Sequence, residues 1–161
     1  MLWQEKYYLA GKNKVQLIGD KVMRRAFLEQ YKNFAVLQEV RFPRFTADMV
    51  LVHTASGTIN GIEFKSDRDS LNRLPMQLQE YTRWLPFVFV ATTLMHRKNV
   101  LKILEDFPTV GLFVYIMEDE KRGFVYEKDA YYNDVSGMGV EWIRPNHQLY
   151  QWAYLLEKAY K

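Results

Sequence analysis

The sequence predicts a single mixed α/β domain in which helices flank a central β-sheet. In several segments, apolar residues recur every three or four positions, which is the period of an amphipathic helix. Other segments are rich in β-branched and aromatic residues and are bounded by glycine-containing turns, as strands are. These segments follow one another as helix, three strands, helix, strand, helix, strand, strand and helix, an order typical of a sheet covered by helices.

The composition agrees with one globular domain of 161 residues, since 48% of them are hydrophobic and 16% are aromatic. There are no cysteines, which excludes disulfides and thiolate chemistry and fits a reducing compartment such as the cytoplasm. We expect no secretory signal and no contact with a membrane, because no apolar run approaches the roughly 18 residues of a membrane span. The net charge of +3 permits a nucleic-acid partner without requiring one.

The first half of the chain predicts one helix and three strands. The helix runs from Val15 to Tyr31, with its regular part beginning near Asp20, and the strands occupy 34–42, 47–54 and 61–66. In the first strand, alternation predicts one side with Ala35, Leu37, Glu39 and Arg41 and the other with Val36, Gln38, Val40 and Phe42. The turn at 56–61, with Gly57 and the Asn60–Gly61 pair, predicts a hairpin between the second and third strands. Four basic residues off the apolar stripe of the helix are expected on a solvated face, with phosphate contact as the alternative: Lys21, Arg24, Arg25 and Lys32.

The second half begins with a helix in which Pro75 suits the first turn, and its apolar stripe consists of Leu74, Leu78, Tyr81 and Leu85. Tyr81 is therefore expected in the core rather than in catalysis. Residues 87–93 form a near-continuous apolar run, as in a strand buried on both faces. The remaining expected elements are a helix at 96–107, strands at 111–117 and 123–129, and an amphipathic helix at 147–160.

A small group of charged residues interrupts the apolar strands of the hairpin. Glu63 and Lys65 lie two residues apart and share one face, whereas Ile62 and Phe64 point to the other face and can pack against a helix. Asp48 lies in the other arm of the hairpin, among apolar residues. Two adjacent carboxylates repel, so one pKa should rise unless a hard divalent cation binds them. Mg²⁺ or Mn²⁺ would suit these oxygens and the Phe64 carbonyl, and with Lys65 beside it would support phosphodiester hydrolysis. The plainer interpretation is a solubilising Glu-X-Lys pair on an exposed strand.

A longer pattern surrounds these residues. The segment EFKSDRDSLNRLPMQ at 63–77 resembles the PD-(D/E)XK nuclease superfamily, and more narrowly its small stand-alone members from bacteria and phage, in which an EXKSDRDSLXRLPXQ-type signature follows the catalytic strand. VMRRAFL at 22–28 looks like the start of that narrower group, and Ala47 replaces the proline of the superfamily name. The resemblance implies a restriction-endonuclease-like core with a mixed sheet at about 15–93, extended within the same domain by 94–161.

The resemblance also implies roles for individual residues. Asp48 and Glu63 would be metal ligands, Lys65 the catalytic lysine and Gln77 a supporting residue. Glu39 would supply a third carboxylate, with Glu29 on the preceding helix as its competitor. The implied cofactor is Mg²⁺ or Mn²⁺. By their position in the sequence, the candidate phosphate contacts are Arg41, Arg44, Arg68 and Arg73, and a plain surface role is the equal alternative for Arg41, Arg44 and Arg73. The cluster Asp67, Arg68 and Asp69 either orients the lysine or, more commonly for such a cluster, forms caps and salt bridges.

We therefore expect a metal-dependent DNA endonuclease that serves DNA repair, recombination or phage DNA processing. Because no base-reading module is recognisable, cutting directed by DNA structure or ends is favoured over a strict recognition sequence. The alternative is a catalytically silent protein of the same fold that binds nucleic acid or a protein partner in phage–host conflict. A homodimer is compatible with either function. The histidines at 53, 96 and 147 are scattered, so no zinc site is expected.

Overall fold

The structure is a computed structural model that describes residues 17–32, 34–53, 55–118 and 121–135. Within these residues, the elements are α2 (Asp20–Gln30), β1 (Ala35–Arg41), β2 (Thr46–His53), β3 (Thr58–Lys65), α3 (Leu74–Trp84), β4 (Phe87–Thr93), α4 (Leu94–Leu104), β5 (Gly111–Glu118) and β6 (Lys121–Lys128). This order agrees with the predicted order from the first helix to the last strand. The helix predicted at 147–160 lies outside the described residues.

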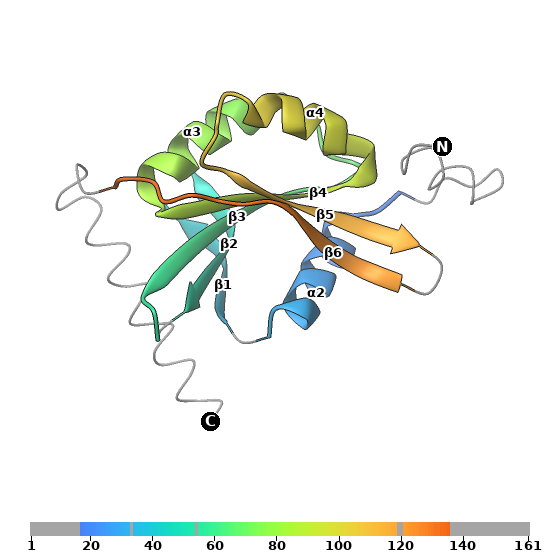
Figure 1. The fold of residues 1–161 in the computed structure, drawn as a ribbon, viewed down its shortest axis with the longest axis horizontal. Coiled ribbons are helices and arrows are strands. Elements are labelled where there is room, and N and C mark those ends of the chain that lie inside the picture. Colours follow the sequence, from blue (N-terminus) through green and yellow to red (C-terminus); the bar gives the residue numbers. More distant parts are fainter. Residues whose placement is uncertain (1–16, 33, 54, 119–120, 136–161) are drawn as a thin grey trace.

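The strands form one six-stranded sheet in the order β1-β2-β3-β4-β5-β6 (Figure 1). The first three strands pair antiparallel, β3, β4 and β5 pair parallel, and β5 and β6 pair antiparallel. The predicted class, a mixed sheet flanked by helices, is therefore confirmed. Strands β5 and β6 extend the same sheet. None of the helices in the described part of the chain has the length and apolar character needed to cross a bilayer.

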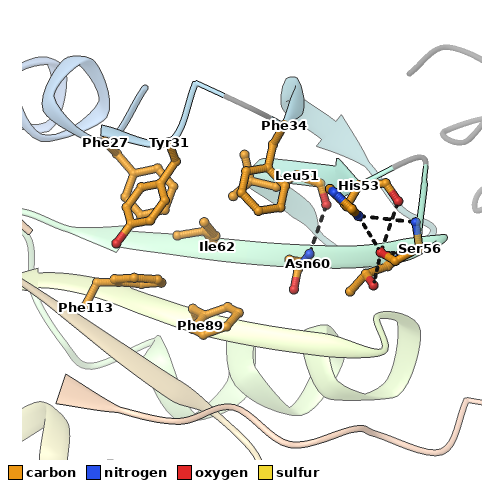
Figure 2. A pocket seen from close by; sticks show the side chains of 11 residues that line it. Phe27, Tyr31, Phe34, Leu51, His53, Ser56, Asn60, Ile62, Phe89 and Phe113 are labelled. Carbon is orange, nitrogen blue, oxygen red and sulfur yellow. Dashed lines mark hydrogen bonds between the residues drawn. The ribbon is translucent and has the colours of Figure 1, made fainter. Parts of the chain in front are cut away.

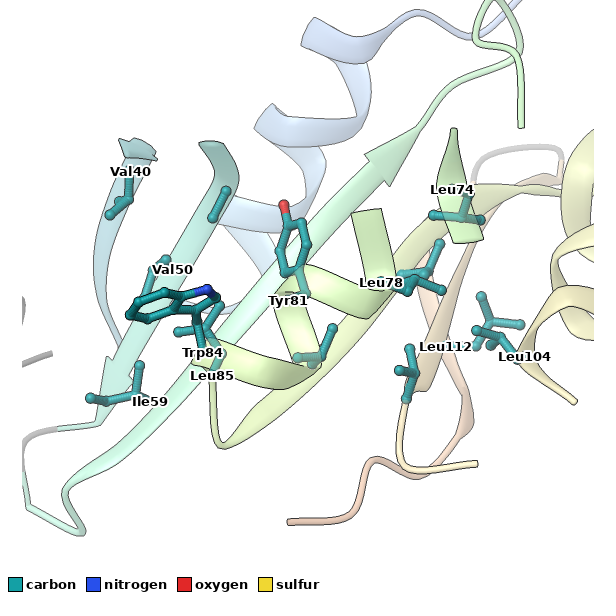
Figure 3. Close-up of a cluster of buried hydrophobic side chains, with 14 of the residues drawn as sticks. Val40, Val50, Ile59, Leu74, Leu78, Tyr81, Trp84, Leu85, Leu104 and Leu112 are labelled. Carbon is teal, nitrogen blue, oxygen red and sulfur yellow. The ribbon is translucent and has the colours of Figure 1, made fainter. Parts of the chain in front are cut away.

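Two hydrophobic layers hold the helices on the sheet. Helices α3 and α4 cover one face and α2 covers the other (Figure 1). On the α3 side, Tyr81, Trp84 and Leu85 pack over β2 and β3 (Figure 3). All four residues of the predicted α3 stripe are buried, because the helical period places them on one face.

The α2 face is built around one aromatic ring. Phe27 is fully buried and meets the rings of Phe64 and Phe113 nearly edge-on, with centroids 5.6 Å and 5.2 Å away. The prediction that Phe64 packs against a helix is thus confirmed. At the end of α2, the Gln30 amide donates to and accepts from the backbone of Phe124, both at 2.8 Å. Helix α2 is therefore fixed across β3, β5 and β6.

Strand β1 departs from the predicted alternation at Glu39. Ala35 and Leu37 pack on the α3 side, and so does Val40, although simple alternation would place it on the α2 side. The cause is the left-handed backbone at Glu39, whose φ is 53°. It interrupts the alternation, so that Val40 points to the same face of the sheet as Leu37. A left-handed conformation costs an L-residue roughly 1–2 kcal/mol. The strain lies beside the acidic residues of the hairpin.

The hairpin turn differs in one detail from its prediction. Gly57, with φ of 71°, lies in the turn as expected, but Asn60 and Gly61 belong to β3. Gly61 is needed for packing, because a Cβ there would lie 2.3 Å from Leu85 Cδ1 and 3.2 Å from the Tyr81 ring. The missing side chain lets α3 approach the sheet and bring Tyr81 close to β3.

Candidate active site

Three acidic residues, distant in sequence, lie in one row at the same end of the sheet. In the β1–β2 pairing, Glu39 and Asp48 lie between the pairs Gln38–Met49 and Val40–Ala47 and therefore face each other. The β2–β3 pairing, continued by one residue, places Asp48 opposite Glu63. Opposite residues on antiparallel strands have Cα atoms roughly 4.5–5.5 Å apart. The hairpin register, which could not be derived from the sequence, therefore brings Asp48 and Glu63 together.

Tyr81 of α3 connects these two acids. Its hydroxyl accepts a hydrogen bond from the Asp48 backbone N–H at 2.9 Å and donates one to Glu63 Oε2 at 2.5 Å. The Phe64 N–H donates to Asp48 Oδ2 at 2.9 Å, so the carboxylate of Asp48 is also tied to β3, the strand that carries Glu63. Tyr81 is in the core as predicted, but it also orients the candidate site.

Burial dominates the electrostatics of this pair. It raises the pKa of Glu63, whose residue surface is only 3% exposed, and the neighbouring Asp48 carboxylate raises it further, to about 7. Burial also raises the pKa of Asp48, opposed by the Phe64 N–H and by Arg24. A proton held by Glu63 thus removes the repulsion near neutral pH. A divalent cation would also remove the repulsion between the two carboxylates, because it would neutralise their charge, as expected from the sequence.

Lys65 completes the group from the next position on the same face of β3. Its ammonium Nζ lies 3.3 Å from Glu63 Oε1, and the residue is 5% exposed. The Thr92 hydroxyl donates to the Lys65 carbonyl at 2.9 Å, which ties β3 to β4 at this end. A cation beside the carboxyl group two residues earlier is the arrangement that the Glu-X-Lys spacing predicts, and the solubilising interpretation does not fit such burial.

Arg24 of α2 is the residue that sequence reasoning missed. It was expected on a solvated face, yet its side chain is only 15% exposed. Its guanidinium lies 2.8 Å from Asp20 Oδ2, 2.8 Å from Glu39 Oε1 and 3.2 Å from Asp48 Oδ1. It also donates to the Asp48 carbonyl at 3.1 Å and stacks over the Phe64 ring, 5.5 Å from its centroid. The only sequence signal was an arginine one turn after Asp20.

The remaining predicted residues are placed as follows. Glu39 belongs to the row of acids, but its side chain turns outward and is 63% exposed. Its carboxylate pairs there with Arg24. Its competitor Glu29 lies elsewhere on α2, beside a polar hollow that it lines with Tyr115 and Arg122. Gln77 lies on α3 and is partly buried, and its Oε1 accepts no hydrogen bond from the described residues.

In the loop after β3, Asp67 and Asp69 cap backbone N–H groups, as the more common interpretation of this cluster predicts. Asp67 Oδ2 accepts the Ile18 N–H at 2.8 Å, and Asp69 Oδ2 accepts the N–H and hydroxyl of Ser66 at 2.7 Å and 2.9 Å. These bonds anchor the chain before α2 to the end of β3. The four predicted phosphate contacts are exposed on loops and termini at this same end of the sheet: Arg41, Arg44, Arg68 and Arg73.

The donor chemistry of the site fits a hard cation. Asp48 and Glu63 offer two carboxylates, and the Phe64 carbonyl was expected as a third oxygen. Mg²⁺ binds with few protein ligands and keeps several waters, so two carboxylates are a sufficient protein contribution. Across the described ranges, however, no group of three or more His, Asp or Glu side chains is gathered as a metal cluster would be. Glu39 does not complete one, and its carboxylate is instead paired with Arg24 at 2.8 Å.

A separate apolar pocket lies at the opposite end of the hairpin, on the α2 face. It has a volume of about 380 Å³ and is lined by aromatic rings such as Phe34 and Phe89, together with His53 and Asn60 (Figure 2). The His53–Thr58 pair marks the turn end of the hairpin, whereas the acids lie at its open end. The pocket is therefore not part of the candidate site.

Comparison with known proteins identifies a sequence family. Residues 8–135 match the family described as Bacteriophage P4 protein cII. No curated protein matches the sequence. Among solved structures, SfsA of Pyrococcus furiosus in complex with Ca²⁺ is similar, with a TM-score of 0.38 and 12% identity. That similarity covers 70% of this chain and 61% of the SfsA chain, so this chain spans less than two thirds of SfsA.

Proposed function

The chain belongs to the Bacteriophage P4 protein cII family, and we propose that it is a metal-dependent DNA nuclease with a PD-(D/E)XK-type site. The observation that supports this proposal best is the convergence of Asp48, Glu63 and Lys65 at one end of the sheet. Two carboxyl groups lie there on adjacent, paired strands, and a buried ammonium lies 3.3 Å from one of them. Burying such a group costs stability, which a purely structural role would not require.

Each residue has a distinct part in the proposed reaction. Asp48 and Glu63, with the Phe64 carbonyl, would hold Mg²⁺ or Mn²⁺. When bound, the cation would activate water and balance the negative charge on the phosphate in the transition state. Lys65 would donate hydrogen bonds to the attacking water or to a phosphate oxygen, and the unpaired Oε1 of Gln77 could accept one from water. Tyr81 keeps Glu63 pointed toward Asp48 through its hydrogen bond.

DNA is the proposed partner because cationic side chains surround the site. Arg41 ends β1 and Arg44 lies in the loop after it, Arg68 follows β3, and Arg73 precedes α3. All four are exposed, so they can contact phosphates, the source of most sequence-independent affinity. Together with the phage family, this arrangement favours processing of phage DNA over sequence-specific restriction.

The test is cleavage of plasmid, linear duplex and single-stranded DNA with Mg²⁺, with Mn²⁺ and with EDTA. We expect metal-dependent cutting that falls at least about 100-fold in Asp48→Asn and in Lys65→Met, a typical loss for a catalytic group. The matched controls are Asp106→Asn and Lys102→Met, because both residues are exposed at the end of α4 that is farther from the β4 end next to the site. Equal cutting by the site variants would identify a contaminant and refute the proposal.

A second function is favoured by one specific observation. Arg24 pairs with both Glu39 and Asp48, so an internal cation already balances part of the acidic row. A protein that kept this pairing would bind DNA, or a protein partner, without cutting. The same experiment separates the two, since tight DNA binding unchanged by EDTA, with no cleavage in Mg²⁺ or Mn²⁺, would establish the silent alternative.

A further inference from the structure

The guanidinium of Arg24 lies among the oxygens that the proposed metal would need. Asp48 Oδ2 accepts the Phe64 N–H, and the other oxygen, Oδ1, is the one that faces Arg24 at 3.2 Å. The same side chain contacts the Asp48 carbonyl and Glu39 Oε1. Arg24 therefore contacts three of the four predicted metal-binding residues. It pairs with Asp48 and Glu39, and its guanidinium stacks on the Phe64 ring.

The position of Arg24 is built into the fold. Its side chain is 15% exposed and lies between α2 and the sheet. Asp20, one turn earlier on α2, forms an ion pair with Arg24 Nε at 2.8 Å. Neighbouring Met23 and Phe27 are fully buried, so α2 cannot rotate to remove Arg24 without losing core packing. Only the side chain itself can move away from Asp48.

We propose that Arg24 is an internal counter-cation that competes with the divalent metal for Asp48 and Glu39, so that metal binding displaces its guanidinium. This inference rests on the proposed metal-dependent function. A guanidinium and a dication on the same carboxylate oxygen repel each other, and the repulsion is strong in a partly buried site. Without metal, Arg24 keeps the acidic row from repelling itself. With metal, Asp48 Oδ1 exchanges one cation for the other.

The opposite role is that Arg24 only positions Asp48 for the metal. The two roles make opposite predictions for a variant without the charge. If Arg24 competes, its removal strengthens metal binding, because the metal no longer has to displace it. If Arg24 positions Asp48, its removal weakens metal binding, because the carboxylate loses its orientation.

The experiment measures Mn²⁺ binding to the full-length protein without DNA, by the electron paramagnetic resonance signal of unbound Mn²⁺ at fixed ionic strength. We expect Arg24→Met to bind Mn²⁺ about tenfold more tightly than the wild type, as loss of a close unscreened charge implies. The control is Arg25→Met, because Arg25 is the exposed next residue on α2 and its loss should leave the affinity within about twofold.

A second variant, Arg24→Lys, applies if circular dichroism shows that Arg24→Met does not fold. A lysine keeps the charge but lacks the planar guanidinium fork whose separate nitrogens reach Asp20, Glu39 and Asp48, so we expect tighter Mn²⁺ binding than the wild type by a smaller factor. Equal or weaker binding by a folded Arg24 variant would overturn the competition and leave the metal site standing. No Mn²⁺ binding by the wild type or by either variant would overturn both this inference and the proposed function.

Discussion

The raised pKa of Glu63 makes the stability of the protein depend on pH in a way that one substitution should remove. The pKa of Glu63 is about 7 in the folded chain and 4.5 as a reference for the unfolded chain. A group whose pKa is raised by folding contributes stability that is complete below the unfolded pKa and is lost as pH rises through the folded pKa. The loss therefore falls between pH 4.5 and pH 7, and the protein is less stable above this window.

The size of the effect follows from the shift. Each pKa unit corresponds to about 1.4 kcal/mol, so a change from 4.5 to about 7 implies about 3 kcal/mol for this buried group. Glu63→Gln cannot ionise and should not show this loss. Relative to the wild type, the variant should gain about 3 kcal/mol in free energy of unfolding between pH 4.5 and pH 8. The comparison cancels any constant cost of the substitution, including a weakened contact with Lys65.

The assay is urea unfolding followed by tryptophan fluorescence at several pH values, with urea chosen because it adds no ionic strength. Glu29→Gln, an exposed carboxylate on α2, is the control and should follow the wild-type curve. Adding Mn²⁺ at pH 8 should stabilise the wild type but not Glu63→Gln, since a ligand that binds only the folded state stabilises it. Parallel pH curves for the wild type and Glu63→Gln would refute the reasoning, because they would mean that Glu63 ionises as it does in water.

Three further substitutions test the surroundings of the site by the same unfolding assay. Tyr81→Phe should lower the free energy of unfolding by about 1–3 kcal/mol, because it leaves the buried Asp48 N–H without its acceptor. It should also shift the pH-dependent loss of stability to higher pH, because the tyrosine hydrogen bond lowers the pKa of Glu63 in the wild type and the variant lacks it. An unchanged midpoint of that loss on the pH axis would contradict this. Gly61→Ala should cost about 1–3 kcal/mol through the clash with Leu85, whereas Gly19→Ala, with nothing within 4 Å of the new Cβ, should cost less. Glu39→Gly should be more stable than Glu39→Ala by about 1 kcal/mol. Both variants lose the carboxylate, but only glycine adopts the positive φ of this position without steric strain. A more stable alanine variant would show that the backbone is not strained.

The elements of the fold were predictable because local periodicity is coupled to burial. The α3 stripe from Leu74 to Leu85 and the apolar run at 87–93 each identified the correct element, and the strand spacing of Glu63 and Lys65 placed both on one face. Errors arose where tertiary contacts override local signals. The Asn60–Gly61 pair is typical of a turn, but its glycine serves the approach of Leu85.

The candidate site was predictable only in part, because its partners come from distant elements. The sequence indicated Asp48, Glu63 and Lys65 through their unusual place in apolar strands. It gave no sign that a phenol of α3 would bond to both acids, since Tyr81 also fits the apolar stripe. Nor could spacing show that Arg24 turns inward, because a cation beside an apolar stripe is solvated unless acids face it across the sheet.

The two helices act on different acids from opposite faces of the sheet, and together they explain why the site tolerates its own charge. From one face, α3 supplies a neutral hydroxyl that fixes Glu63, while burial favours the protonated form of this acid. From the other face, α2 supplies a permanent positive charge that favours the ionised form of Asp48. One acid is thus kept ready to lose a proton and the other is kept paired with a cation. A divalent metal would replace both the proton and the arginine, so the order in which they leave determines how metal binding depends on pH.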